Sequence, residues 1–418
     1  MQRISVLGAA TGADPAARRI VAALVVAVFV QGLGASAVLP LLPLYLRAHG
    51  TSTGLVGAIM GSFFFAGVLT QYAAGHLTDR IGHRPVIVGG LALYAAASLG
   101  FIATIGAGGY LALRSLQGVG SGAVQVATFA VVGLVVPQER RGRAFSLIFA
   151  AQLAGMAIGP LAGSAAGVAN LRWLFVATAV ASMAAAIPVL TRAGVDVRAN
   201  QTAEQGPRSP LVITKALVGV AFVGVATGLV TGVYEGCWSL LMHSRGAADW
   251  QIGLSWTLFA LPFAVFAPLA GRLADHLDRR WLAGGAVLAS CAFAATYPFL
   301  TSVSWLLGLG TAEAIATVAA YPAAQSLLTQ AATPETQGRA QGFFTTAETA
   351  SIATAATVGG AMFAAARWLP FVSAAIGGAA LMGALPALWR SLPGRAATTG
   401  APPSAELTVP NPVSQALR

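Results

Sequence analysis

The sequence predicts an all-α membrane protein with twelve transmembrane helices in two six-helix bundles related by a parallel internal repeat. Three observations predict this fold class. The 418 residues are 56% hydrophobic and 9% charged, with a mean hydropathy of +0.75, and a soluble domain of this length needs far more surface charge. The apolar segments reach the roughly 20 residues that a helix needs to cross a bilayer. Finally, the motif at 75–84 returns 196 residues later at 271–280, and Gly142-Arg143-Ala144 returns as Gly338-Arg339-Ala340.

The apolar segments define the order of the predicted helices. They span residues 19–46, 54–76, 85–104, 107–136, 143–167, 171–193, 212–242, 250–274, 280–301, 305–330, 338–365 and 368–390. The first six form an N-terminal bundle at 19–193, and the last six form a C-terminal bundle at 212–390. A polar, proline-bearing linker at 194–211 joins them, with a cytoplasmic segment at 1–18 and a disordered cytoplasmic tail at 391–418.

The distribution of basic residues predicts the orientation in the membrane. Twelve spans place both termini and the loops after even-numbered spans on one side. That side holds 19 of the 24 Lys and Arg residues, the opposite side holds four, and Arg114 lies inside a span. By the positive-inside rule, both termini are cytoplasmic and the protein lies in the plasma membrane. The net charge of +11 therefore indicates orientation, and we expect no nucleic-acid partner.

This orientation can be measured with reporter fusions. Fusions at Arg198 and at the C-terminus are both expected to report a cytoplasmic location, because the basic loops resist translocation. A reporter pair such as alkaline phosphatase and green fluorescent protein reads the two sides independently. A periplasmic signal from either site would contradict the twelve-span topology.

The titratable residues do not indicate a metal or an enzyme active site. The two cysteines lie in separate spans, and the five histidines lie in loops or at span ends without the spacing of metal ligands. We therefore predict no metal site and no cofactor. A membrane-embedded enzyme would need histidines or paired carboxylates beside a nucleophile inside the spans, and none is seen, so no enzymatic activity is predicted.

The repeated loop motif predicts a charged latch between helices on the cytoplasmic side. Its acidic residues lie near helix ends, and its arginines can pair with them or with a neighbouring helix terminus. Its glycine at 75 allows a close helix approach. The residues of this latch are Gly75, Asp79, Arg80, Gly82 and Arg84 in the first copy, and Asp275, Arg279 and Arg280 in the second.

The fifth span carries a smooth face of small residues. Gly155, Gly159 and Gly163 recur at every fourth position, which places them on one side of the helix. Such a face lets another helix approach closely, and Pro160 adds a bend. We predict a helix-packing surface here.

Arg114 is the most costly residue of the chain, because a lone arginine at a helix centre costs about 2.5–3.5 kcal/mol on insertion scales. It needs a partner or a wet cavity. Gln117, Ser121 and Gln125 follow on the same helix face and form a polar stripe. The repeat offset carries this stripe to the tenth span as Glu313, Thr317, Tyr321 and Gln325. The two stripes predict two helices that face one shared aqueous cavity.

Acidic residues inside spans are few, and they are the candidate proton carriers. Glu235 and Glu313 lie at a depth similar to that of Arg114, and Glu348 lies nearer the middle or the inner half. We expect Glu313 to face the cavity and Arg114 to pair with Glu313 or Glu235. The predicted proton-coupling set is thus Arg114, Glu235, Glu313 and Glu348. The predicted cavity lining adds Gln31, Thr231, Tyr234 and Trp238 to the two polar stripes.

Three of these segments carry a family resemblance. The loop at 75–84 resembles the signature between helices 2 and 3 of the major facilitator superfamily. The segment from Arg114 to Ala123 resembles its helix 4 signature, whose arginine the family links to proton coupling. The segment at 155–163 resembles the helix 5 signature of the twelve-span drug–proton antiporter branch. The resemblance implies that helix 5 packs against the opposite half of the protein, where a smooth face permits rocking.

The residues and the resemblance together favour a secondary active transporter. We expect proton-coupled efflux of a small, partly hydrophobic molecule by alternating access, in a protein that contacts membrane lipids and acts as a monomer. An uncoupled facilitator and a lipid flippase of the same fold are the alternatives, and a membrane-embedded enzyme is a remote one. One departure bears on the mechanism. Helix 1 offers only Gln31 where many antiporters of this branch carry an acid, so the C-terminal half must supply the carboxyl groups.

Overall fold

The computed structural model describes residue 7 and residues 15–103, 106–191, 211–333 and 336–390, without the side chains of 72, 138, 139, 264 and 267–276. This part of the chain is helical and contains no strand. The N-terminal half comprises α2 (Pro15–Val38), α3 (Leu42–Ala48), α4 (Thr53–Ile81), α5 (His83–Gly100), α6 (Gly106–Val135), α7 (Gln138–Ser164), the short η1 (Val168–Asn170) and α8 (Leu171–Thr191). The C-terminal half comprises α9 (Lys215–Val233), the π-helical turn η2 (Tyr234–Trp238), α10 (Ser239–Ser244), α11 (Asp249–His276), α12 (Arg279–Thr296), η3 (Tyr297–Phe299), α13 (Val303–Thr317), α14 (Ala320–Ala331), α15 (Gln337–Ala365) and α16 (Leu369–Leu388).

Each predicted span coincides with one of these helices or with consecutive helices of the list, so the predicted fold class is confirmed. Among the described residues, nine helical segments are long and apolar enough to cross a membrane. α5, α11 and α15 are not among them. α15 is the most polar of the three and packs between α4 and α9, where Thr345, Thr349 and Glu348 line cavities inside the protein.

Three spans are broken near the middle or the end. α2 stops before Pro40 and resumes as α3 with Pro43 in its first turn, because proline supplies no backbone donor to continue the first helix. The tenth span divides into α13 and α14 at 318–319, four residues before Pro322, whose missing N–H leaves the carbonyl of Val318 without its helical partner. The seventh span contains the π-turn η2, a type of turn that often marks a functional site.

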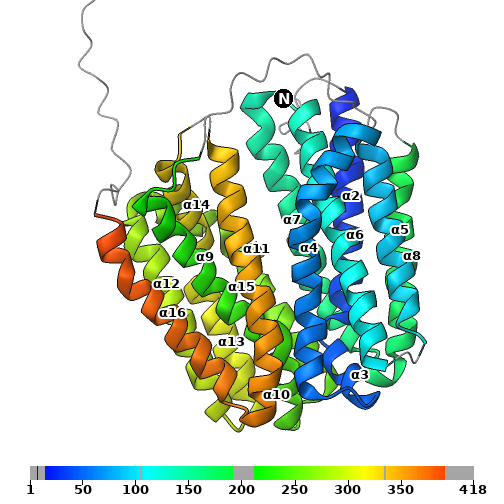
Figure 1. Ribbon diagram of the computed structural model, residues 1–418, viewed down its shortest axis with the longest axis vertical. Coiled ribbons are helices and arrows are strands. Elements are labelled where there is room, and N and C mark those ends of the chain that lie inside the picture. The colour runs from blue at the N-terminus through cyan, green and yellow to red at the C-terminus, as the bar shows by residue number, and fades with distance from the viewer. Residues whose placement is uncertain (1–6, 8–14, 104–105, 192–210, 334–335, 391–418) are drawn as a thin grey trace, which may run out of the picture.

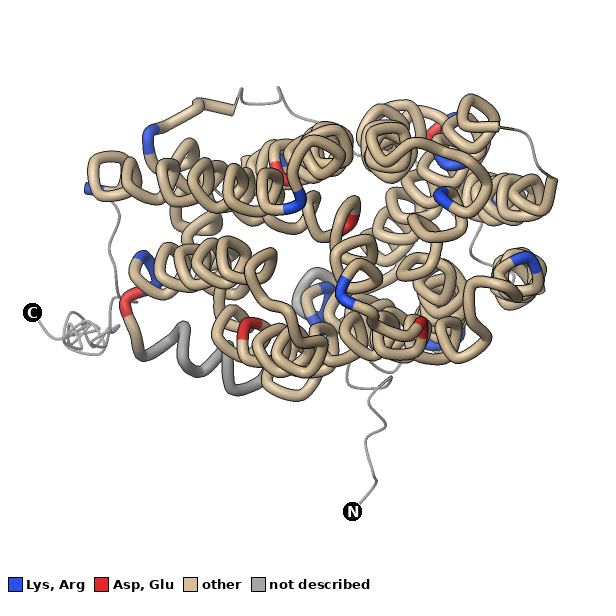
Figure 2. Tube along the Cα trace, turned by 90° about the horizontal axis from the view of Figure 1, so that it is seen from below, with Lys and Arg blue, Asp and Glu red and all other residues tan. Residues whose placement is uncertain are grey.

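The two halves lie side by side in Figure 1, with the N-terminal helices in blue to cyan and the C-terminal helices in green to red. α2 packs on α7 and α4 packs on α6 in the first half, whereas α9 packs on α15 and α16 in the second. Between the halves, α4 contacts α15 and α7 contacts α11. Seen end-on in Figure 2, the helices carry few charged residues, as expected for a protein surrounded by lipid.

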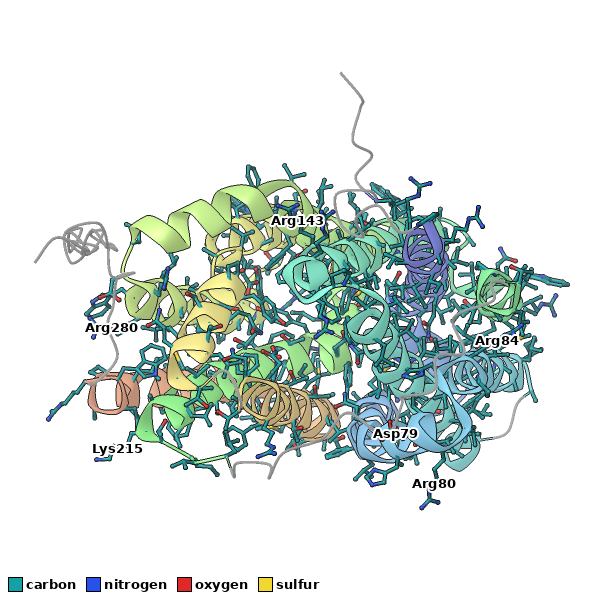
Figure 3. All side chains as sticks on the ribbon, turned by 90° about the horizontal axis from the view of Figure 1, so that it is seen from above. Asp79, Arg80, Arg84, Arg143, Lys215 and Arg280 are labelled. Atoms are coloured by element: carbon teal, nitrogen blue, oxygen red, sulfur yellow. The ribbon has the colours of Figure 1, made fainter. Side chains whose placement is uncertain are left out.

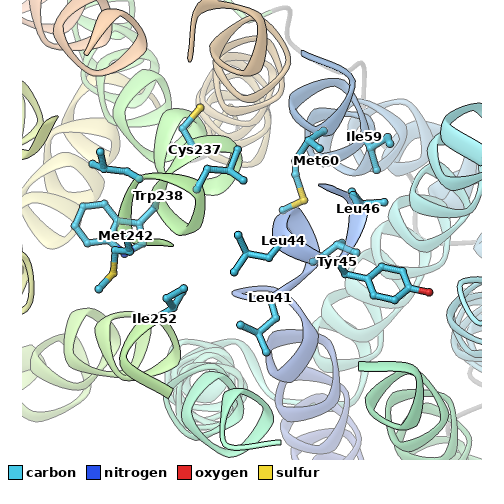
Figure 4. Close-up of a cluster of buried hydrophobic side chains, with 14 of the residues drawn as sticks. Leu41, Leu44, Tyr45, Leu46, Ile59, Met60, Cys237, Trp238, Met242 and Ile252 are labelled. Carbon is cyan, nitrogen blue, oxygen red and sulfur yellow. The ribbon is translucent and has the colours of Figure 1, made fainter. Parts of the chain in front are cut away.

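The halves meet most tightly at one end of the molecule, here called the closed end. A cluster of buried hydrophobic side chains fills this end, and Figure 4 shows that it draws on both halves. Leu41 and Met60 come from the first half, and Trp238 and Met242 come from the second. The opposite end, here called the Gly82 end, carries the loop between α4 and α5, and the ribbons of the two halves diverge toward it in Figure 1.

Close backbone contacts and two hydrogen bonds between described residues join the N-terminal half to the C-terminal half. These contacts lie nearer the closed end than the Gly82 end. A Cβ at Gly57 would lie 2.5 Å from the carbonyl oxygen of Ala356 and 2.7 Å from the Cα of Gly360. The Asp249 carboxylate accepts a hydrogen bond from the backbone N–H of Val168 at 2.8 Å. Thr257 Oγ1 donates to the carbonyl oxygen of Ala157 at 2.7 Å. In the orientation that the basic residues predict, this end is extracellular, and the conformation would be inward-facing.

The glycine face of α7 has a different partner from the one that the family resemblance implies. A Cβ at Gly155 would lie 2.6 Å from the carbonyl oxygen of Phe29, and one at Gly159 would lie 2.5 Å from that of Leu33. Gly163 is equally close to Ala37. These partners belong to α2 of the same half, so the expectation of a glycine face against the opposite half is wrong. α7 does contact the opposite half, but through the carbonyl oxygen of Pro160, which lies beside Gly253 of α11.

This correction changes the expected effect of a substitution in α7. Gly159→Ala is expected to destabilise the N-terminal half, because the new methyl group has no room against the α2 backbone and overpacking costs about 1–3 kcal/mol. Gly142→Ala on the same helix is the matched control, since nothing lies within 4 Å of its Cβ position. Thermal unfolding of the purified protein in detergent measures both. Equal midpoints for the two variants would contradict the tight α2–α7 contact.

The predicted latch residues lie at the Gly82 end, where Figure 3 labels several of them. Gly82 ends α4 with a φ of 92°, and its N–H bonds the carbonyl oxygen of Thr78 at 2.9 Å. Arg84 donates to the carbonyl oxygen of Leu190 at the end of α8, which satisfies a helix terminus. Asp79 and Arg80 are exposed, and among the described residues Asp79 makes no hydrogen bond or ion pair.

Two features of the latch differ from the sequence expectation. Nothing lies within 4 Å of the Cβ position of Gly75, so this glycine permits no close helix contact in this conformation. In the second copy, Asp278 begins α12, and its carboxylate pairs with Arg280 at 2.8 Å. Hydrogen bonding from Arg280 holds the pKa of Asp278 below its ordinary value. Arg279 follows at the start of α12, and the side chain of Asp275 lies outside the described residues.

Candidate functional site

A polar cavity of about 320 Å³ lies between the two halves. Its N-terminal wall includes Arg114 and several amide side chains, and its C-terminal wall includes Glu235. The amides are those of Gln31, Gln71, Gln125 and Gln152. Since α2, α4, α6 and α7 face η2 and α15 across this space, any relative movement of the halves changes its shape.

Arg114 is held in place by its own half of the protein. It is 5% exposed, and one guanidinium nitrogen donates to Gln117 Oε1 at 2.9 Å. Gln117 in turn donates to Ser98 Oγ at 2.9 Å, which ties α6 to α5. The guanidinium lies over the Phe63 ring, 4.4 Å from its centroid, and interacts electrostatically with Tyr94, which lines the same cavity. These contacts keep the charge of Arg114 inside the protein.

Glu235 is the acid that interacts electrostatically with Arg114 across the cavity. It is 9% exposed, and no group of the described residues bonds its Oε2. The guanidinium Nε of Arg114 also lacks a partner there. The structure therefore places one buried positive charge and one buried carboxyl group on opposite halves, with an unused donor and an unused acceptor. Two buried ionisable groups that face each other without a direct ion pair are costly to bury, which is a mark of functional sites.

Glu313 lies elsewhere and has different partners. It is 1% exposed, and three hydroxyl groups donate to its carboxylate. Tyr234 bonds both oxygens at 3.1 Å, Ser290 bonds Oε1 at 2.5 Å, and Tyr297 bonds Oε2 at 2.7 Å. The expectation that Glu313 faces the cavity and pairs with Arg114 is therefore wrong. The break between α13 and α14 and the hydroxyl groups of α12 and η3 enclose this carboxylate within the C-terminal half.

A second, apolar cavity of about 290 Å³ lies mainly within the C-terminal half. Aromatic rings form much of its wall, and Ser290 and Tyr234 separate it from Glu313. Phe149 of α7 also reaches it and stacks on Tyr321, with ring centroids 6.1 Å apart and planes 11° apart. Glu348 is the carboxyl group that lines this cavity.

Two successive residues of the π-turn η2 line different cavities. Tyr234 lines the apolar cavity and bonds Glu313, whereas Glu235 lines the polar cavity opposite Arg114. A π-turn inserts one residue into the helix and thereby changes the direction of the side chains that follow. The sequence contains no direct signal for this turn.

The predicted cavity residues divide between the two spaces. Gln31, Ser121 and Gln125 line the polar cavity, and Thr231, Tyr234, Thr317 and Tyr321 line the apolar one. Three predicted residues line neither. Gln117 lies behind Arg114 as its hydrogen-bond partner, and Trp238 belongs to the closed end, where its indole donates to Ser255 Oγ at 2.9 Å. Gln325 follows the helix break, and its amide nitrogen is buried without a hydrogen-bond partner among the described residues.

Several site residues were absent from the sequence prediction. Tyr94 contacts Arg114, and Ser290 and Tyr297 bond Glu313. Tyrosines and a serine inside apolar spans are weak signals alone, because such hydroxyl groups commonly bond the backbone of their own helix. Phe259 and Phe263 recur four positions apart on α11 and line the apolar cavity, but this spacing equally fits lipid-facing residues.

The bundle of paired helical halves, with polar groups buried around cavities between and within them, defines a membrane transporter. The chain belongs to the Major Facilitator Superfamily, which it matches over residues 24–243 and 216–417. It is 26% identical over 340 residues to the MFS-type transporter YttB of Bacillus subtilis, covering 78% of this chain and 84% of that protein. It is also 26% identical over 352 residues to the class E tetracycline resistance protein of Escherichia coli, with the same coverage of both chains.

Solved structures agree on the fold. The nucleoside transporter NupG superposes with a TM-score of 0.75 at 13% identity, covering 89% of this chain and all of that one. The human organic anion transporter MFSD10 superposes with a TM-score of 0.63 at 18% identity, again covering 89% of this chain. At these identities the likeness concerns the fold alone.

Proposed function

We propose that this protein is a proton-coupled transporter that carries a small, partly hydrophobic molecule out of the cell by alternating access. The observation that carries the proposal is that Arg114 and Glu235 line the polar cavity from opposite halves, where they interact electrostatically without a direct ion pair. The two charges belong to different halves, so their attraction contributes to the relative position of the halves. The resistance proteins among the relatives support export as the direction.

The proton acts through Glu235. An arginine keeps its charge under all physiological conditions, so only the carboxyl group of this pair can exchange a proton. A protonated Glu235 no longer attracts Arg114, which weakens one of the interactions between the halves. A ligand or proton shifts a conformational equilibrium only by its differential interaction with the two states, and this pair supplies such a difference.

The surfaces between the halves are suited to rocking. Among the described residues, the contacts at the closed end consist of hydrophobic side chains, glycine backbone and two hydrogen bonds, and no ion pair joins the halves there. Separation of this end with closure at the Gly82 end would expose the cavities to the other side of the membrane. Alternating access in related architectures works by this kind of movement of one bundle against the other.

Transport in proteoliposomes tests the proposal. Purified protein is reconstituted and assayed by counterflow with a substrate panel that includes tetracycline and chloramphenicol, with and without an imposed pH gradient. We expect accumulation against the substrate gradient only when the pH gradient is present, and its loss on addition of a protonophore. Equal transport without the gradient would identify an uncoupled facilitator. Movement of labelled lipids in place of the panel would identify a flippase.

A further inference from the structure

We propose that the apolar cavity of the C-terminal half recognises an organic cation, an aromatic or otherwise lipophilic amine, through the carboxylate of Glu348. The inference rests on the proposed function in that it places this cavity on the transport path. It goes further by naming the chemical class of the molecule and the side chain that recognises its charge.

The first argument is the isolation of the Glu348 carboxyl group. It lines the cavity from α15, and among the described residues it makes no hydrogen bond or ion pair. Its electrostatic neighbour is Tyr321, which is uncharged. Glu313, by contrast, receives bonds from three hydroxyl groups. Glu348 is half-buried, and a carboxyl group without partners in an apolar wall is costly, so a cationic ligand would supply the missing partner.

The second argument is the composition of the cavity wall. Its aromatic side chains are Phe149, Tyr234, Phe259, Phe263, Tyr321 and Phe344. Aromatic faces attract ammonium groups and stack on planar apolar bodies. No Lys, Arg or His is among the described residues that line this cavity. An anionic ligand would therefore meet one carboxylate and no compensating charge.

The third argument is the separation of charge between the two cavities. The basic Arg114 lines the polar cavity, where Glu235 already interacts with it. Binding of a cation is therefore favoured in the apolar cavity, which Glu348 lines. The volume of about 290 Å³ lies at the small end of the ~300–1,000 Å³ that ligand pockets usually occupy, which fits a molecule with a compact ring system.

Binding measured without any gradient tests this inference separately from transport. The probes share one apolar body and differ in charge: 2-(1-naphthyl)ethylamine, its quaternary trimethylammonium derivative, 2-(1-naphthyl)ethanol and 1-naphthylacetate. Affinities are measured by isothermal titration calorimetry on the detergent-purified full chain. We expect the two cations to bind at least about tenfold more tightly than the alcohol, and the carboxylate to bind most weakly.

Variants assign this preference to Glu348. Glu348→Gln is expected to remove the higher affinity for both cations and to leave the affinity for the alcohol within about threefold of its native value. The amide keeps the shape of the side chain and loses its charge. Glu348→Asp is expected to retain part of the advantage. Glu406→Gln in the C-terminal tail is the matched control for the loss of one negative charge, and we expect it to leave the affinities of all four probes unchanged.

The outcomes separate the two proposals. Cation recognition would be overturned by any of three results: equal affinities for the amine and the alcohol, no measurable binding of the cations, or an equal loss of affinity for all probes in Glu348→Gln. Selective cation binding together with transport that ignores the pH gradient would overturn proton coupling and leave cation recognition standing.

Discussion

Replacement of Glu235 by glutamine is expected to abolish pH-driven accumulation while substrate exchange without a gradient continues. Glutamine keeps the size of the side chain but carries no exchangeable acid proton, and it presents a permanently neutral group to Arg114. The equilibrium between conformations therefore no longer responds to the proton gradient. Accumulation in proteoliposomes should fall to the level seen without a gradient, a loss of at least about tenfold, with counterflow within about twofold of the native protein.

Two further variants show whether this effect belongs to the Arg114–Glu235 pair. Arg114→Lys keeps the positive charge but loses the planar group that lies over Phe63 and bonds Gln117, so we expect impaired coupling and impaired binding. Glu313→Gln changes a carboxylate that has no contact with Arg114. If Glu235→Gln retained uphill transport with native pH dependence while Glu313→Gln lost it, the proton site would lie in the hydroxyl-bonded carboxylate of the C-terminal half.

Replacement of Gly57 by leucine is expected to prevent the closed end from closing. The new side chain has no space, because a Cβ already lies 2.5 Å from the carbonyl oxygen of Ala356 in the other half. Overpacking costs about 1–3 kcal/mol, which shifts the equilibrium between the two conformations by roughly 5- to 150-fold. Transport should be lost, because the protein no longer returns to the conformation described above.

A buried cysteine reports the state of this end. Cys237 lies in the closed-end cluster at 0% exposure, and its Sγ is 3.5 Å from the Cβ position of Gly359. In a Cys291→Ser background it is the remaining thiol of the chain. A membrane-impermeant maleimide added to intact cells should label it at least about tenfold faster in Gly57→Leu than in the parent. Gly89→Leu is the control, since nothing lies within 4 Å of that position and neither labelling nor transport should change. Unchanged labelling and transport in Gly57→Leu would show that this contact does not separate.

The fold was predictable because hydrophobic length and the 196-residue repeat act on whole segments. The buried charge of Arg114 was also predictable, since an arginine within an apolar span requires a protected setting wherever its partners lie. The sequence did not identify which acid lies opposite Arg114, because both Glu235 and Glu313 were candidates. Depth along the helices made Glu235 and Glu313 equivalent, and the π-turn and the break before Pro322 then directed them into different surroundings.

The partners of helix faces were the least predictable feature. The spacing of Gly155, Gly159 and Gly163 correctly indicates a face that allows close approach, but periodicity does not identify the helix that approaches. The same limit applies to Trp238, whose position on the helix fits a cavity wall as well as the closed-end cluster where it lies. The partner of the glycine face and the surroundings of Trp238 both depend on how the helices are rotated relative to one another. That rotation is decided by contacts between distant parts of the chain.

The distribution of the two cavities over the helices has a consequence for adaptation to new compounds. α11, α12 and α14 contribute to the apolar cavity, and among the described residues they supply none that line the polar cavity with Arg114; α7, α15 and the seventh span contribute to both. Under the function proposed above, substitutions on the first three helices would reshape what the protein accepts without altering how it is energised. Laboratory evolution toward a chosen cargo should therefore concentrate its mutations there.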